Sequence, residues 1–260
     1  MTEITLQALL GCVEKVAVRA GKEIMAIHSQ DFTVEQKADN SPVTEADKAA
    51  NDIIVAGLEA LPVSFPILTE EAVEAFSGPD AEGCYWLVDP LDGTKEFIQR
   101  NGEFTVNIAL IQQGRPVLGV VYAPALDVTY MGGKGIGAFK VEGKGPRQPI
   151  QVAKHQSGSV WRVLGSRSHA SQKVLEWLKP LGEYELVPMG SSLKICLVAE
   201  GAADLYPRFG KTSLWDTAAA HAVVNAAGGA IETLQGKVLD YSNTAKTLNP
   251  EFVVYGGSRP

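Results

Sequence analysis

The chain carries, at residues 85–94, the stretch Tyr-Trp-Leu-Val-Asp-Pro-Leu-Asp-Gly-Thr. Its leading apolar residues predict a buried strand that ends at Asp89, and the proline and glycine that follow predict a tight turn carrying Asp92. On such a turn the two carboxylates can point at one spot, where the Leu91 carbonyl adds another oxygen of the kind that Mg²⁺ prefers. The alternative is an ordinary Asp-Gly turn, but this combination at the mouth of a buried strand favours a site.

The residues after Asp92 indicate what such a site would bind. If a helix starts near Thr94, the free N–H groups of Gly93 and Thr94 face the same spot as the carboxylates. Backbone N–H groups at the start of a helix suit a phosphate. The stretch therefore predicts that cations and a phosphate are held together.

Further acids occur where an apolar run ends or a helix begins. Glu70-Glu71 follows the run Phe-Pro-Ile-Leu-Thr, although such a pair on its own is more often a solvated face. Asp47 follows Thr44 by three residues, which fits a capping box as well as a catalytic role. Asp216 opens a helix that closes at a double glycine, where it fits an N-cap as well as a metal ligand. Together these carboxylates are placed as in a multi-metal phosphoryl-transfer site.

The apolar pattern on either side of this stretch predicts a layered α/β fold. Amphipathic helices are expected first, at 6–27 and 44–58. Short β-rich runs then predict an antiparallel meander, at 85–88, 105–111, 117–122 and 128–131. Beyond about residue 150 the expected strands are 160–164, 203–206, 230–233 and 253–255, and the expected helices 172–178, 191–199 and 217–227. We therefore predict two packed halves, 1–150 and 151–260, built from helix and sheet layers.

Composition excludes several classes of protein. The 260 residues include 23 basic and 30 acidic ones, a net charge of 23 − 30 = −7 without a basic tract, which argues against nucleic-acid binding. No apolar stretch reaches the ~18 residues of a membrane span, and the N-terminus lacks the features of a secretion signal. Cys12, Cys84 and Cys196 form no CxxC motif, so we expect a reducing compartment and a cytoplasmic protein.

The spacing of the relevant residues does not match other known catalytic and cofactor-binding motifs. The four histidines and three cysteines lack the spacing of a zinc or iron site. The triplet Gly210-Lys-Thr212 ends like a phosphate-binding loop but lacks the upstream glycine, and no GxSxG nucleophile elbow occurs. The glycine-rich stretch 132–149 is expected to form a loop and a hairpin.

Two of these motifs resemble the signatures of a known family. The stretch 89–94, and Trp215-Asp216 with eleven residues before Gly228-Gly229, are similar to the signatures of the inositol monophosphatase superfamily of magnesium-dependent, lithium-sensitive phosphatases. The extension Asp-Gly-Thr-Lys-Glu-Phe at 92–97 and the block Gly-Ser-Ser-Leu-Lys at 190–194 more closely resemble its CysQ branch of 3'(2'),5'-bisphosphate nucleotidases. That branch hydrolyses adenosine 3',5'-bisphosphate to AMP and phosphate. The resemblance covers nearly the whole chain and implies an αβαβα sandwich.

The resemblance also implies a metal site with two or three Mg²⁺ ions. Its expected ligands are four carboxylates and one backbone carbonyl: Glu70, Asp89, Asp92, Asp216 and the carbonyl of Leu91. Thr94 and Asp47 match the pair that activates the attacking water.

The substrate contacts that the resemblance implies lie on several segments. They are Gly93 and Thr94 through their amides, His169, Ser191, Lys194, Arg208 and Asp216. Four of them have structural alternatives: Ser191 as an N-cap, Lys194 on a solvated helix face, Arg208 in a surface ion pair and His169 in a loop. The cations are favoured because a second phosphate needs positive charge, which an acidic protein must supply locally. Phe209, where inositol enzymes tend to carry a carboxylate, is expected to form an apolar wall that suits a nucleotide.

We therefore expect a phosphoric monoester hydrolase that removes the 3'-phosphate of adenosine 3',5'-bisphosphate by direct attack of an activated water. The nearest alternative is a phosphatase of the same fold that acts on inositol monophosphate or a sugar bisphosphate, and a more distant one is a non-catalytic nucleotide-binding protein. The expected partner is a small nucleotide, without nucleic acid or obligate membrane association. Cleavage of 3'-phosphoadenosine 5'-phosphosulfate, the choice between monomer and homodimer, and peripheral attachment to an inner membrane face stay open.

Overall fold

The computed structural model describes residues 5–36, 42–165 and 172–260. Its α-helices are α1 (Leu6–His28), α2 (Glu45–Glu59), α3 (Thr94–Ile98), α4 (Gln172–Leu178), α5 (Leu193–Ala199) and α6 (Trp215–Ala226). Two short 3₁₀ helices are η1 (Glu70–Ala75) and η2 (Lys179–Leu181). Thr44 caps α2 with the capping box that the sequence predicts.

The larger sheet has seven strands, which pair in chain order. They are β3 (Ile67–Thr69), β4 (Cys84–Asp92), β5 (Thr105–Gln112), β6 (Arg115–Ala123), β7 (Val128–Gly133), β8 (Gly137–Glu142) and β9 (Gln148–Ile150). Only β3 and β4 run parallel, and every later neighbour is antiparallel, so the predicted meander is confirmed.

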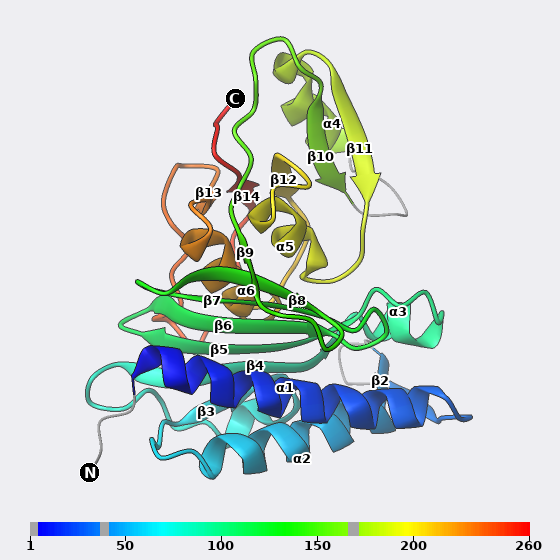
Figure 1. The fold of residues 1–260 in the computed structure, drawn as a ribbon, viewed down its shortest axis with the longest axis vertical. Coiled ribbons are helices and arrows are strands. Elements are labelled where there is room, and N and C mark those ends of the chain that lie inside the picture. The colour runs from blue at the N-terminus through cyan, green and yellow to red at the C-terminus, as the bar shows by residue number, and fades with distance from the viewer. Residues whose placement is uncertain (1–4, 37–41, 166–171) are drawn as a thin grey trace.

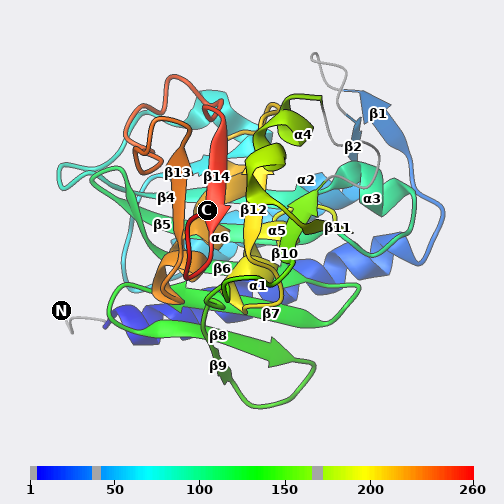
Figure 2. The same ribbon diagram turned by 90° about the horizontal axis from the view of Figure 1, so that it is seen from above.

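The smaller sheet has five strands in the order β11-β10-β12-β14-β13 (Figure 2). They are β10 (Trp161–Gly165), β11 (Tyr184–Pro188), β12 (Leu205–Arg208), β13 (Ala230–Thr233) and β14 (Phe252–Tyr255). A separate two-stranded ribbon pairs β1 (Val34–Gln36) with β2 (Pro42–Thr44).

Helices and sheets alternate in five layers (Figure 1). Helices α1 and α2 cover one face of the larger sheet, and α5 and α6 lie between its other face and the smaller sheet. Helix α4 covers the far face of the smaller sheet through a small apolar cluster that includes Trp161, Val163 and Leu178. The predicted αβαβα class is confirmed.

Helix α6 lies unusually close to the larger sheet. A Cβ atom at Gly119 of β6 would come within 2.1 Å of the Ala219 carbonyl oxygen, so a glycine is needed there. The buried face of the helix is rich in alanine, which keeps the helix close to the strands. This packing brings the first turn of α6, which carries Asp216, to the end of β4.

Several elements differ from the sequence expectations. Strands β3 and β11 were not predicted, whereas the expected hairpin in 132–149 is confirmed, because β8 and β9 pair antiparallel there. Helix α5 begins at Leu193, later than expected, because Ser191 has a positive φ of 44° and Ser192 is the N-cap. Within the described ranges no helix combines the length and the apolar character needed to cross a membrane. The division into halves near residue 150 stays a prediction.

Candidate active site

The two acids of the opening motif lie where the pairing of β4 with β5 is interrupted. Asp89 lies opposite Asn107 and Asp92 opposite Thr105, so three steps along β4 match two along β5. Side chains alternate between faces along a strand, and without this β-bulge the two acids would point to opposite faces. The extra residue places both on the face of Asn107 and Thr105. Pro90 is tolerated inside the bulge because proline has no N–H to donate to a neighbouring strand.

The turn after Asp92 depends on a glycine. Gly93 has φ +96°, and a Cβ atom there would lie 3.1 Å from the Glu103 carbonyl oxygen. Helix α3 begins at Thr94, and its first backbone hydrogen bond runs from Phe97 N to Gly93 O at 2.9 Å. The N–H groups before Phe97 are therefore outside the helical ladder, as the sequence predicts.

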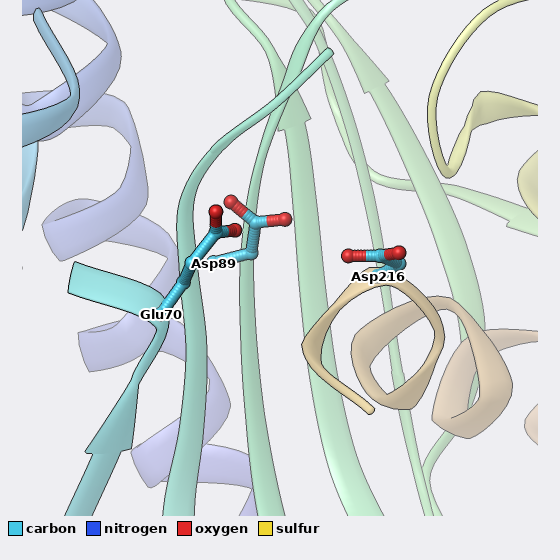
Figure 3. A group of neighbouring side chains, drawn as sticks. All are labelled: Glu70, Asp89 and Asp216. Carbon is cyan, nitrogen blue, oxygen red and sulfur yellow. The ribbon is translucent and has the colours of Figure 1, made fainter. Parts of the chain in front are cut away.

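Carboxylates from three separate elements meet beside this turn. Ligand oxygens of Glu70, Asp89 and Asp216 lie within 4.8 Å of one another. Figure 3 shows the Glu70 and Asp89 carboxylates together, with Asp216 facing them from the start of α6. The N-cap of α6 is Leu214, so Asp216 is not the N-cap, and its Oδ2 accepts a hydrogen bond from Ser213 N at 2.7 Å.

The position of Glu70 follows from strand register. Strand β3 runs parallel to β4 with Thr69 opposite Val88, and an acid follows each of these residues: Glu70 at the start of η1 and Asp89 on β4. Among the described residues, the group that could hold a metal ion contains Glu70 and not Glu71.

The carboxylates of the site repel one another. Asp89 is 1% exposed, and burial together with the charges of Glu70 and Asp92 raises its pKa well above the usual range. Burial and the charge of Asp92 likewise raise the pKa of Asp216. Burial also raises the pKa of Asp92, while Lys194 opposes this rise. Such a cluster is electrostatically unfavourable without a cation, and its oxygen donors suit a hard divalent ion.

The Asp47 carboxylate interacts with two residues, Thr44 and Thr94. Its Oδ2 accepts hydrogen bonds from Thr44 N and Thr44 Oγ1, both at 2.7 Å, which is the capping interaction. Its Oδ1 lies 3.3 Å from Thr94 Oγ1, which also lies 3.5 Å from the Leu91 carbonyl oxygen. The structural and the catalytic interpretations of Asp47 are therefore compatible, because each uses a different oxygen.

Asp92 is held by a polar cluster that the sequence did not reveal. Ser192 N donates to Asp92 Oδ2 at 2.6 Å, and Ser192 Oγ donates to Asn107 Oδ1 at 2.8 Å. Thr105 Oγ1 lies 2.8 Å from Ser192 Oγ and 3.2 Å from Ser191 Oγ. These contacts join the bulge of the larger sheet to the loop before α5. The only local signal is the Gly-Ser-Ser block, which does not identify its partners.

A cavity of about 330 Å³ adjoins the carboxylates. It shares Asp92, Gly93, Lys95, Glu96 and Asp216 with the cleft over Glu70 and Asp89. Its other walls include two cations and two aromatic rings: Lys194, Arg208, Tyr206 and Phe252. A negatively charged group and a flat apolar group can both be accommodated there.

Lys194 lies inside this cavity and not on a solvated helix face, so that alternative is wrong. The residue is 8% exposed, and its Nζ donates to the Ser191 carbonyl oxygen at 2.7 Å. The ammonium also lies 5.5 Å from the centre of the Tyr206 ring. Burial lowers the pKa of Lys194 to about 8, and the neighbouring Arg208 charge contributes to the decrease.

The remaining predicted contacts have mixed outcomes. Arg208 lines the cavity, and its Nη2 donates to the Lys211 carbonyl oxygen at 2.7 Å. Ser191 lines the cavity too, and the N-cap alternative for it is wrong because Ser192 occupies that position. Phe209 packs edge-on against Trp177, and the rings lining the cavity are those of Tyr206 and Phe252. His169 lies outside the described residues.

Comparisons with known proteins identify similar sequences and structures. The sequence pattern of the inositol monophosphatase family matches residues 5–253. The 3'(2'),5'-bisphosphate nucleotidase CysQ of Escherichia coli K12 is 51% identical over 248 residues, which are 95% of this chain and 99% of that protein. The crystal structure of CysQ from Bacteroides thetaiotaomicron has a TM-score of 0.83 at 39% identity, covering 99% of this chain and 100% of that one. The inositol monophosphatase of Anabaena has a TM-score of 0.74 at 25% identity, covering 97% and 91%.

Proposed function

This chain belongs to the inositol monophosphatase family, and on that basis we propose that it hydrolyses the 3'-phosphate of adenosine 3',5'-bisphosphate, releasing AMP and phosphate. The observation that carries the proposal is the contact between two compartments, the Glu70-Asp89-Asp216 cluster and the cavity in which Lys194 and Arg208 supply positive charge. A substrate with two phosphates can occupy both compartments at once. An inositol monophosphate has no second phosphate to bind Lys194 and Arg208. The name of the CysQ relatives describes the same class of substrate.

The carboxylate cluster fits divalent metal ions, which we take to be Mg²⁺. Buried acids that repel one another are the donors that a hard cation needs. The residues that would hold two or three ions are Glu70, Asp89, Asp92, Asp216 and the carbonyl of Leu91. When bound, the ions would stabilise negative charge on the transferred phosphate and lower the pKa of the attacking water.

Thr94 and Asp47 would orient that water. The hydroxyl of Thr94 has one proton, and Asp47 Oδ1 at 3.3 Å is placed to accept it. The lone pairs of Thr94 Oγ1 can then accept a proton from the water as the water oxygen attacks phosphorus and the bond from phosphorus to the ribose 3'-oxygen breaks. The released 3'-oxygen takes a proton from solvent. Asp47 keeps its orientation because Thr44 donates two hydrogen bonds to its other oxygen. The amides of Gly93 and Thr94 would bind the phosphate under attack.

The cavity would hold the rest of the nucleotide. Lys194 and Arg208 would bind the 5'-phosphate, with Ser191 and His169 as further contacts. Asp216 lies on the boundary between the two compartments, where the ribose would be placed. The Tyr206 ring lies at the base of the cavity beneath Lys194. 3'-Phosphoadenosine 5'-phosphosulfate carries a sulfate on its 5'-phosphate and has the same 3'-phosphate as the bisphosphate. Its cleavage would therefore use the same catalytic residues.

The proposal is tested by measuring phosphate release from adenosine 3',5'-bisphosphate and inositol 1-phosphate side by side, with Mg²⁺ and then with EDTA. We expect turnover of the nucleotide with Mg²⁺, slower turnover of the inositol ester and none with EDTA. A preference for the inositol ester would retain the metal site and reject the nucleotide pocket. Nucleotide binding without phosphate release would favour the non-catalytic interpretation.

Replacing Lys194 by methionine should weaken binding of the bisphosphate. Lys194→Met keeps a long side chain over the Tyr206 ring but removes the charge, and a hydrogen bond to a charged group contributes about 1.5–3 kcal/mol. We therefore expect KM for adenosine 3',5'-bisphosphate to increase by roughly tenfold to a hundredfold. Adenosine 3'-monophosphate, which lacks the 5'-phosphate, is the matched substrate and should show little change. An equal effect on both substrates would contradict the assignment.

The same lysine should make binding depend on pH. Its pKa is lowered to about 8, so the ammonium is present below that pH and is lost above it. For the wild-type protein, kcat/KM for the bisphosphate divided by kcat/KM for adenosine 3'-monophosphate should therefore decrease as the pH rises through 8. In Lys194→Met that ratio should be low and independent of pH over this range.

A further inference from the structure

A segment near the C-terminus lies against the stretch of chain that precedes Asp216. Leu214 N donates to the Thr247 carbonyl oxygen at 2.7 Å, and Asn249 N donates to the Thr212 carbonyl oxygen at 2.9 Å. Between these bonds, Ser213 and Leu248 form an isolated antiparallel bridge. The approach to α6 is therefore held by residues that lie more than thirty positions later in the sequence.

The side chain of Asn249 completes this attachment. Its Nδ2 donates to the Ser213 carbonyl oxygen at 2.6 Å and to Thr217 Oγ1 at 3.1 Å, and it also lies 3.4 Å from Thr212 Oγ1. Ser213 N in turn donates to Asp216 Oδ2 at 2.7 Å. Asn249 therefore bonds to Ser213, which orients the carboxylate, and to Thr217, the residue after Asp216.

Thr217 is also held by a buried hydrogen-bond network that includes Tyr241 and His221. Its hydroxyl accepts from Asn249 Nδ2 and lies 3.2 Å from the Leu214 carbonyl oxygen and 3.0 Å from Tyr241 OH. Tyr241 OH also lies 3.0 Å from His221 Nδ1. Burial lowers the pKa of His221 to about 3, so the imidazole stays neutral. The network thus gives the first turn of α6 a fixed position.

We propose that Asn249 is a positioning residue that holds the Ser213–Asp216 turn so that the Asp216 carboxylate faces Glu70 and Asp89. The inference rests on the proposed function, in which Asp216 is a metal ligand. Asp216 needs such support because Asp92 and Glu70 both repel it. Groups that orient a ligand without touching the metal typically change metal affinity by about 10–100-fold when they are lost.

The test is a direct titration of the purified protein with Mn²⁺, followed by the electron paramagnetic resonance signal of the free ion. For Asn249→Ala we expect Mn²⁺ binding to be weaker by about 10–100-fold. At saturating metal, KM for the bisphosphate should equal that of the wild type, since Asn249 does not line the nucleotide cavity. The matched control is Asn243→Ala, an exposed asparagine in the same loop, which should bind Mn²⁺ like the wild type.

A second variant separates the lost hydrogen bonds from a change in charge and from misfolding. Asn249→Asp keeps the shape but removes the donor and adds a negative charge, which by itself would strengthen cation binding. Weaker Mn²⁺ binding in both variants, with far-ultraviolet circular dichroism unchanged, would support the inference. Wild-type affinity in Asn249→Ala, or tighter binding in Asn249→Asp, would overturn it. A wild-type protein that binds no Mn²⁺ and releases no phosphate would instead overturn the proposed function, and the inference with it.

Discussion

Asp89→Asn is expected to reduce phosphate release by about a thousandfold, because the metal site would lose its central carboxylate and with it several kcal/mol of transition-state stabilisation. Asp89 belongs to the cluster with Glu70 and Asp216 and is the most deeply buried of the three. An asparagine has the same shape, so the β-bulge and the turn should remain. The measurement is kcat for adenosine 3',5'-bisphosphate at saturating Mg²⁺.

The same substitution should stabilise the metal-free protein. Burial and repulsion raise the pKa of Asp89 in the folded state well above its unfolded value of about 4. Between these two values the folded state binds more protons than the unfolded state, so the free energy of unfolding decreases as the pH rises. Asp89→Asn removes this contribution, and with EDTA its Tm at pH 7 should exceed that of the wild type.

Two controls make this prediction specific. Glu71→Gln removes an acid next to Glu70 that lies outside the metal-ion group, and it should retain wild-type kcat. Addition of Mg²⁺ should raise the Tm of the wild type much more than that of Asp89→Asn. Wild-type kcat in Asp89→Asn at saturating Mg²⁺ would contradict the metal assignment, and a lower Tm with EDTA would contradict the electrostatic account.

The sequence predicts those parts of the fold that are determined by residues close together in the chain. The meander from β4 to β7 was visible because apolar runs alternate with Gly, Pro and Asp. Strand β11 was not visible, because its residues are exposed or half-buried and it forms through backbone pairing with β10. The later start of α5 depends on the positive φ of Ser191, which no residue preference requires.

The candidate site likewise has parts that a local motif predicts and parts that depend on contacts between distant residues. The opening motif predicts Asp89 and Asp92 together, although the reason that they share a face is a bulge against β5. Glu70 reaches the cluster through the parallel register of β3, which depends on residues far apart in sequence. The burial of Lys194 and the bonds of Asn249 arise only when the two sheets enclose α5 and α6. These contacts form only in the folded chain. A polar residue that belongs to no sequence motif gives no sign of them in the sequence.

The second large effect is expected at Thr94, where alanine should lower kcat by roughly 10²–10⁴-fold, the usual contribution of a positioned proton acceptor. Thr94→Ala removes the hydroxyl that lies 3.3 Å from Asp47 Oδ1 but leaves the backbone amide, so substrate binding should change little. Thr94→Ser restores the hydroxyl and should recover most of the activity. Single-turnover rates, measured with Mn²⁺ affinity in parallel, separate the chemical step from metal binding.

Thr94→Ala is a cleaner test of this pair than any change at Asp47. Asp47→Asn would leave one oxygen where Thr44 and Thr94 each use one, so the contacts from Thr44 would compete with Thr94 for it, and a weakened cap costs about 0.5–2 kcal/mol of stability. Its effect on turnover would therefore combine a weaker start of α2 with the missing proton acceptor. If Thr94→Ala kept wild-type kcat while Asp47→Asn lost it, Asp47 would act through the fold of α2, and the attacking water would need another acceptor.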